Sequence, residues 1–270
     1  MKILPLVFQS ILSVALLGHA RAAMYQNDFS TTGFTTENDS GDWTVSAGAY
    51  QDVYTGNNTV SSASVEIVGV NGTSFTMSSQ FTINSYNPGT TSSASTLGFG
   101  LMGADSDFGG GSSGTAYYLA DFGYAYGTSA STKGGLRILA LGDASGFTST
   151  ATSNNFDGNT ANLAVTEDET YTLKLTGTYN GSGHLELSFG LFDSTGTTQF
   201  GSSATAIDTT PLLGTHFGYR NRTASNSSSA TNLNASFDNF SVATIPEPST
   251  VVLSSIVMLG FLIFGRRRMS

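Results

Sequence analysis

The chain contains no cysteine, and positively charged residues are scarce along most of its length. Its 270 residues include 10 Lys+Arg against 19 Asp+Glu, with only 11% charged residues and 5 prolines. The absence of cysteine excludes disulfides, thiolate metal ligands and a cysteine nucleophile. A nucleic-acid binder needs clustered Lys and Arg to displace the counterions of the phosphates. We therefore predict that nucleic acid is not a partner.

A sustained helical period is also missing between residues 24 and 245. Apolar and polar residues alternate instead, for example from Leu185 to Leu191, and a period of two residues indicates β-strands. Many short strands with one polar face are typical of two packed antiparallel sheets, so the predicted fold class is all-β, an antiparallel two-sheet sandwich. The predicted strands are Tyr25–Phe29, Trp43–Ser46, Ala49–Tyr54, Ser64–Val68, Thr73–Asn84, Leu97–Met102, Ala116–Tyr126, Gly135–Leu141, Tyr171–Thr176, Leu185–Leu191, His216–Tyr219 and Ala235–Val242.

The segments between these strands carry turn residues. Asn180-Gly181-Ser182-Gly183 joins two alternating strands and is the strongest hairpin signal, because Asn and Gly tolerate positive φ. Three long polar stretches, Ala104–Gly114, Asp143–Thr160 and Asn221–Asn232, are predicted to be surface loops. Trp43 is the only tryptophan and opens an early strand. We expect it to pack between the sheets and not to meet a ligand.

The N-terminus has the features of an export signal. Lys2 precedes the apolar run Leu6–Leu17, and Ala20-Arg21-Ala22 follows with small residues around a cleavage point. This order is typical of a secretory signal peptide. We predict a helical signal peptide over residues 1–22 and an exported protein.

The C-terminus has the features of a membrane anchor with a break before it. Pro246, Glu247, Pro248 and Ser249 precede the 15-residue apolar run Val251–Gly265, and Arg266-Arg267-Arg268 follows. Two prolines stop regular structure from continuing out of the domain. The apolar run is marginal for a membrane span, and three arginines would hold its end in the cytoplasm. We predict a transmembrane helix over residues 249–265; an ordinary tail anchor is the alternative.

This order of Pro-Glu-Pro, apolar helix and basic cluster over residues 245–270 resembles the PEP-CTERM sorting domain. The resemblance implies that an exosortase-type membrane transpeptidase recognises the segment and removes it, in Gram-negative bacteria that make extracellular polysaccharide. The protein would be anchored in the inner membrane before processing and would then lie at the cell surface or in the extracellular matrix.

A second resemblance covers the predicted domain, residues 23–244. Asp42-Trp43-Thr44-Val45, Gly48-Ala49-Tyr50, Gly218 and the closing Ala235–Val242 are similar to the concanavalin A-like, laminin G-type jelly rolls. The resemblance implies a two-sheet jelly roll whose first and last strands pair. One fold hosts many functions, so it does not imply a ligand.

Catalytic chemistry finds little support in the sequence. The resemblance to the jelly-roll family implies that a glycoside hydrolase would carry three acids at alternate positions of one strand. The strand that includes Glu186 has one acid only, and Glu167-Asp168-Glu169 are consecutive, so their side chains would point to opposite faces. We assign no catalytic residue, predict that the protein is not an enzyme, and rank a glycoside hydrolase last.

A structural calcium ion is the one cofactor for which ligands are available. Asp105 and Asp107 have the D-x-D spacing of a calcium loop, although a third side-chain ligand is missing. The jelly-roll resemblance implies that Asp28 and Asp238, on the first and last strands, could share a calcium ion. The alternatives are a solvated acidic loop for the first pair and turn capping for the second.

Two functional interpretations follow. The first is an exported, non-enzymatic surface or matrix protein that is sorted by its C-terminus. The second is a carbohydrate-binding module for extracellular polysaccharide, because Tyr118, Tyr124 and Tyr126 share one face of a strand and aromatic rings stack on sugars. A core position for this stripe is the favoured alternative. Residues 23–245 carry five basic and 18 acidic side chains, a balance that discourages contact with anionic polymers unless divalent cations intervene.

Overall fold

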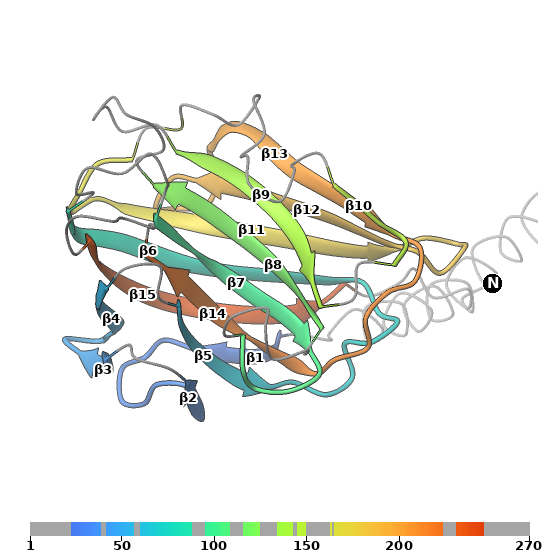
Figure 1. The fold of residues 1–270 in the computed structure, drawn as a ribbon, viewed down its shortest axis with the longest axis horizontal. Coiled ribbons are helices and arrows are strands. Elements are labelled where there is room, and N and C mark those ends of the chain that lie inside the picture. The colour runs from blue at the N-terminus through green and yellow to red at the C-terminus, as the bar shows by residue number, and fades with distance from the viewer. Residues whose placement is uncertain are drawn as a thin grey trace, which may run out of the picture.

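The protein is a two-layer antiparallel β-sandwich in the computed structural model (Figure 1). The structure describes residues 23–38, 42–56, 60–87, 95–108, 116–124, 134–142, 145–149, 163, 165–223 and 231–245. Within these ranges there is no helix, and accordingly none that is long and apolar enough to cross a membrane. The predictions of an all-β class and of antiparallel sheets are confirmed.

The larger layer is a nine-stranded sheet. Its strands, in spatial order, are β10 (Phe147–Ser149), β13 (Gln199–Asp208), β12 (Leu185–Phe192), β11 (Thr170–Tyr179), β6 (Phe75–Asn87), β15 (Thr231–Thr244), β4 (Ala49–Gly56) and β3 (Asp42–Ser46), and β1 (Ala23–Asn27) pairs with β15. The pairing of the first strand with the last, which the jelly-roll resemblance implies, is therefore present.

The smaller layer is a six-stranded sheet that packs against the first. Its strands, in spatial order, are β2 (Thr36–Asn38), β5 (Val60–Glu66), β14 (His216–Arg222), β7 (Ser95–Gly103), β8 (Tyr117–Tyr124) and β9 (Gly135–Leu141). β7, β8 and β9 follow one another in the chain, whereas β14 pairs with β5 and β7 from a distant part of the chain. Long-range pairing therefore decides which residues share a face.

The core lies between the sheets and is rich in aromatic rings. Trp43 is 6% exposed, and its ring lies 4.7 Å from Tyr50 and 6.0 Å from Tyr219 of the opposite sheet. Tyr219 stacks in turn on Phe237 at 4.2 Å. Large aromatic side chains contribute most of the buried area per residue. The prediction that Trp43 packs between the sheets is confirmed.

Several strand boundaries differ from the sequence prediction. The strands β2, β10 and β13 are not predicted, and the predicted loops 143–160 and 221–232 contain β10 and the ends of β14 and β15. In β13 the inward positions are the small residues Ala204 and Ala206, both buried, so the strand lacks the large apolar residues that signal alternation. Backbone pairing with β12 nevertheless holds it in the sheet. The hairpin at Asn180–Gly183 is confirmed, with Asn180 N donating to His184 O at 3.0 Å.

Candidate functional site

The outer face of the six-stranded sheet carries an unusual set of side chains. On β8, Tyr118 and Phe122 belong to the core between the sheets, while Tyr117 and Leu119 belong to a separate apolar cluster. Since side chains alternate along a strand, Asp121 shares the face of Tyr117 and Leu119. This face is turned away from the nine-stranded sheet.

Strand register places charged residues in one row across this face. Arg137 on β9 is opposite Asp121 on β8, and Arg220 on β14 is opposite Ser62 on β5. One step along, Arg222 is opposite Thr96 on β7. Three of the five basic side chains of residues 23–245 therefore gather on one face. We call Asp121, Arg137, Arg220 and Arg222 the arginine row.

One pair within the arginine row forms a buried fork. Arg137 Nε donates to Asp121 Oδ1 at 2.6 Å and Arg137 Nη2 donates to Asp121 Oδ2 at 2.8 Å. Both side chains are almost fully buried. Two parallel charge-assisted bonds hold the guanidinium in a fixed orientation. The Asp121 carboxylate is thereby committed to Arg137.

The next arginine has unused hydrogen-bonding capacity. Arg220 is 5% exposed, and its Nε donates to the backbone oxygen of Phe108 at 2.9 Å. Its Nη1 is buried without a hydrogen-bond partner, and so are Ser62 Oγ and Thr96 Oγ1 on the same face. Within the described ranges no carboxylate pairs with Arg220. Buried polar atoms without partners are costly in a folded protein and are a reason to look for a ligand.

The electrostatics of the row leave it positively charged. The pKa of Arg222 is lowered, first by burial and then by the positive charges of Arg220 and Arg137. Arginine stays protonated at neutral pH in spite of such shifts. Among the described side chains of the row, three are guanidinium groups and one is a carboxylate. The arrangement therefore favours an anionic group.

An apolar cluster lies beside the arginine row on the same face. It consists of Phe108, Tyr117 and Leu119, with Leu139 and Leu141 packed against it. Tyr117 donates its hydroxyl to the backbone oxygen of Phe108 at 2.8 Å, and burial raises the pKa of Tyr117.

The absence of a side chain at Gly100 leaves space for the Phe108 ring of this cluster. A Cβ at Gly100 would lie 2.4 Å from the Phe108 ring. Only glycine lets the segment before Phe108 fold back over β7.

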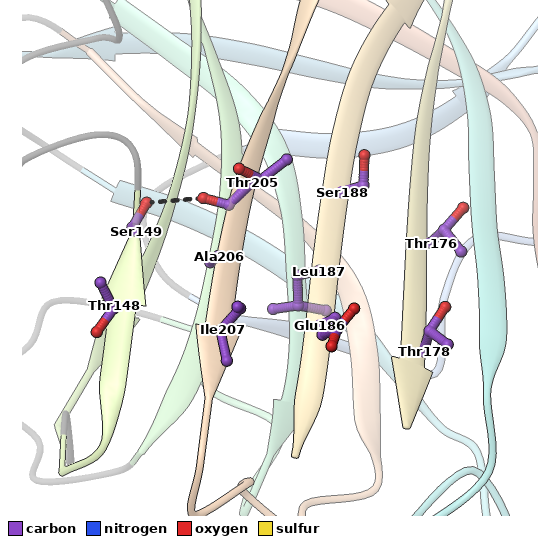
Figure 2. A pocket seen from close by; sticks show the side chains of 10 residues that line it. All are labelled: Thr148, Ser149, Thr176, Thr178, Glu186, Leu187, Ser188, Thr205, Ala206 and Ile207. Atoms are coloured by element: carbon purple, nitrogen blue, oxygen red, sulfur yellow. Dashed lines mark hydrogen bonds between the residues drawn. The ribbon is translucent and has the colours of Figure 1, made fainter. Parts of the chain in front are cut away.

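A second depression lies on the outer face of the nine-stranded sheet. Figure 2 shows this groove, which has a volume of about 390 Å³ and is lined from β10, β13, β12 and β11. The hydroxyls of Thr176, Thr178 and Ser188 and the carboxylate of Glu186 line the groove. Ile207, which also lines it, is 46% exposed. Its lining includes no aromatic ring and no basic side chain. The arginine row is the stronger candidate because it gathers three guanidinium groups and includes buried atoms without hydrogen-bond partners.

Of the three tyrosines predicted as possible glycan contacts, Tyr118 is the one whose side chain the structure describes. Tyr118 is fully buried in the core, where its hydroxyl donates to Asp208 Oδ2 at 2.6 Å and accepts from Leu212 N at 2.9 Å. Its assignment as a glycan contact is wrong, because β8 directs this parity between the sheets. The side chain of Tyr124 and the whole of Tyr126 lie outside the described residues.

The four aspartates considered for calcium lie at two places. Asp28 and Asp238 are close enough that the Asp28 charge contributes to raising the pKa of Asp238, after burial. A shallow groove of about 440 Å³ adjoins Asp28 and Asn239. Asp105 lies after β7, where its Oδ1 accepts from Asp107 N at 2.9 Å.

These aspartates do not form a complete metal site. The described part of the chain contains no group of three His, Asp or Glu that could hold a metal ion. Calcium therefore stays a prediction. The sorting residues Pro246, Glu247, Pro248 and Ser249 and the cluster Arg266, Arg267 and Arg268 fall outside the described residues.

Sequence reasoning did not identify the arginine row. Arg137 stands among apolar neighbours in Gly135–Leu141, which is an available signal, because a charge inside a strand buried on both faces needs a partner. Arg220 and Arg222 alternate on β14, which places them on one face. Which face that is, and that Arg137 shares it, follows only from strand order.

Comparison with known proteins gives solved structures of low sequence identity. No family model and no curated protein matches the chain. An alginate lyase from Aplysia kurodai is 11% identical, with a TM-score of 0.47, over 83% of this chain and 99% of that chain. Peanut lectin is 17% identical, with a TM-score of 0.42, over 83% and 98%. A galectin-like protein of unknown function from Bacillus subtilis is 11% identical, with a TM-score of 0.46, over 84% and 98%.

One sequence-based prediction is contradicted by these comparisons. We predicted that the protein is not an enzyme, yet the similar structures include alginate lyases and a bifunctional GH43-CE chain from Bacteroides eggerthii. The absence of an acidic triplet on one strand excludes only one arrangement of catalytic groups. Enzymatic activity is therefore not excluded. At these identities the likeness concerns the all-β jelly-roll fold alone.

Proposed function

We infer that the β-sandwich binds an acidic carbohydrate at the outer face of its six-stranded sheet. The observation that carries this proposal is the arginine row, with Arg220 Nη1, Ser62 Oγ and Thr96 Oγ1 buried and without partners. A polysaccharide that bears carboxylates offers acceptors for the guanidinium and hydroxyls that pair with Ser and Thr. The half-buried side chains of Leu139 and Leu141 supply apolar surface on the same face.

The row has one accessible side. Asp121, Arg137, Arg220 and Thr96 are buried, whereas Arg222 is half-buried. Its neighbours across the sheet are short, since Gly123 pairs with Thr96 on one side and with Gly135 on the other. Gly123 and Gly135 are themselves buried, so a sugar acid would meet the row at Arg222, its half-buried member. The overall negative charge of the domain does not prevent this, because the cations are concentrated where the ligand binds.

The substitution Arg222→Gln tests the proposal. Loss of a charge-assisted bond to the ligand should weaken binding of the purified full-length protein to alginate, a polyuronate, about tenfold. Circular dichroism of the variant checks that it remains folded. Binding is measured by surface plasmon resonance, with dextran as the neutral polymer.

Lys174→Gln provides the matched control. Lys174 lies on the nine-stranded sheet, where it donates to the Gly196 carbonyl and sits 4.9 Å from the Phe192 ring centroid. The substitution Lys174→Gln removes one positive charge from the other sheet and should leave alginate binding unchanged. Equal weakening by both substitutions would show non-specific attraction and contradict the proposal. Following the alginate chain length in the same samples tests whether bound polymer is also cleaved.

The proposal includes export and sorting of this domain. Its support is the order of an apolar leader, a Pro-Glu-Pro break, the apolar run Val251–Gly265 and the cluster Arg266-Arg267-Arg268. An exosortase-type transpeptidase would act near Pro246–Pro248 and release the domain to the cell surface or matrix. We expect mass spectra of the surface protein to lack the three terminal arginines. A mature protein that retains them would instead be permanently anchored.

A further inference from the structure

Three connecting loops at one end of the sandwich carry no charged residue. Strand pairing brings together the loops 67–74, 180–184 and 209–215 at this end, the right-hand end in Figure 1. None of these loops contains Asp, Glu, Lys or Arg. In contrast, the turns beyond the other ends of β11 and β12 carry Glu167-Asp168-Glu169 and Asp193. The loop that follows β7 at the same end carries Asp105 and Asp107, so the uncharged loops make up only part of this end.

The same end also exposes apolar side chains. Val68 is 68% exposed, Leu213 is 71% exposed and Ile245 is 36% exposed, while most other large apolar residues of the described chain are covered. The loops that carry them adjoin, because Ile67 N donates to Thr215 O at 2.7 Å and Asn71 Nδ2 donates to Leu213 O at 2.8 Å. These side chains are thus neighbours in one surface, which we call the apolar end.

The chain leaves the domain at the apolar end. Ile245 N donates to Ser74 O at 2.7 Å, next to the loop that carries Val68. Only residues 246–250 separate Ile245 from the apolar run Val251–Gly265. A fully extended connection of this length spans about 20 Å. If Val251 lies at the edge of the hydrocarbon, the apolar end lies within reach of the lipid headgroups.

We propose that the apolar end of the sandwich rests on the lipid surface of the membrane in which residues 251–265 insert. Val68 and Leu213 would enter the interface between headgroups and acyl chains, where exposed apolar side chains are favourable. Because the loops carry no cations, zwitterionic lipid is the matching surface. Glu66 and Asp105, the exposed acids at the nearby strand ends, disfavour anionic lipid. This inference rests on the proposed anchoring and is independent of sugar binding.

The cysteine-free sequence permits a direct test. Single variants Val68→Cys, Leu213→Cys and Ser194→Cys of the full-length chain are labelled with an environment-sensitive fluorophore and reconstituted into phosphatidylcholine vesicles. Ser194 is exposed in the turn at the opposite end and is the matched control. A nitroxide quencher on the lipid headgroup should quench the labels at 68 and 213 several-fold more than the label at 194. Aqueous iodide should show the reverse order.

Vesicle flotation separates the two ways in which the inference can fail. A chain that does not float with the vesicles contradicts both the anchor and the apolar end as a lipid contact. A chain that floats but shows equal lipid quenching at 68, 213 and 194 overturns the inference alone. Labels at 68 and 213 that are shielded from iodide but not reached by the lipid quencher would place a protein partner there, and this also overturns it.

Discussion

The substitution Trp43→Ala should lower the melting temperature by about 10 °C, because loss of a core tryptophan costs about 3–5 kcal/mol. The indole contacts Tyr50, Tyr219 and Phe237, which come from both sheets. Its removal therefore leaves a cavity where the two layers meet. Thermal unfolding followed by circular dichroism measures the effect.

Trp43→Phe is the control for this prediction. The indole Nε1 is buried without a hydrogen-bond partner, so phenylalanine removes volume without breaking a bond and should cost much less. The emission of this only tryptophan should be blue-shifted and unchanged by polysaccharide. A red-shifted emission that responds to polysaccharide would show that Trp43 is exposed and binds the ligand.

The second large effect is expected at the buried ion pair. Asp121→Asn should destabilise the fold by about 3–5 kcal/mol, since it leaves the Arg137 guanidinium buried without its counter-charge. The substitution should have little effect on alginate binding, because the Asp121 carboxylate is bonded to Arg137 and does not bind an anion. Chemical denaturation gives the free energy of unfolding.

A double-substitution cycle isolates the pair. Arg137→Met alone leaves the Asp121 carboxylate buried and should be strongly destabilising as well. The double variant Asp121→Asn with Arg137→Met removes both charges and should be more stable than either single variant. Additive losses in the double variant would show that the two side chains act independently, which the two bonds at 2.6 and 2.8 Å argue against.

The candidate site was only partly accessible from the sequence. The tyrosine stripe at residues 118–126 was a correct observation of parity, but parity does not say which face is inside. The structure places Tyr118 in the core and Tyr117 outside, so the residues with the opposite parity line the candidate site. The overall negative charge of the domain argued against an anionic ligand. A global charge balance does not show that three of the five basic side chains gather on one face.

The sequence by itself determined the class of the fold and the core position of Trp43. Alternation such as that from Leu185 to Leu191 is a local property, because each strand has one buried face. The tertiary structure alone decided the strand order, the position of β13 and the assembly of the arginine row. Arg137 and Arg220 lie on strands that two further strands separate. Their proximity follows from long-range hydrogen-bonded pairing, which a local pattern of residues does not encode.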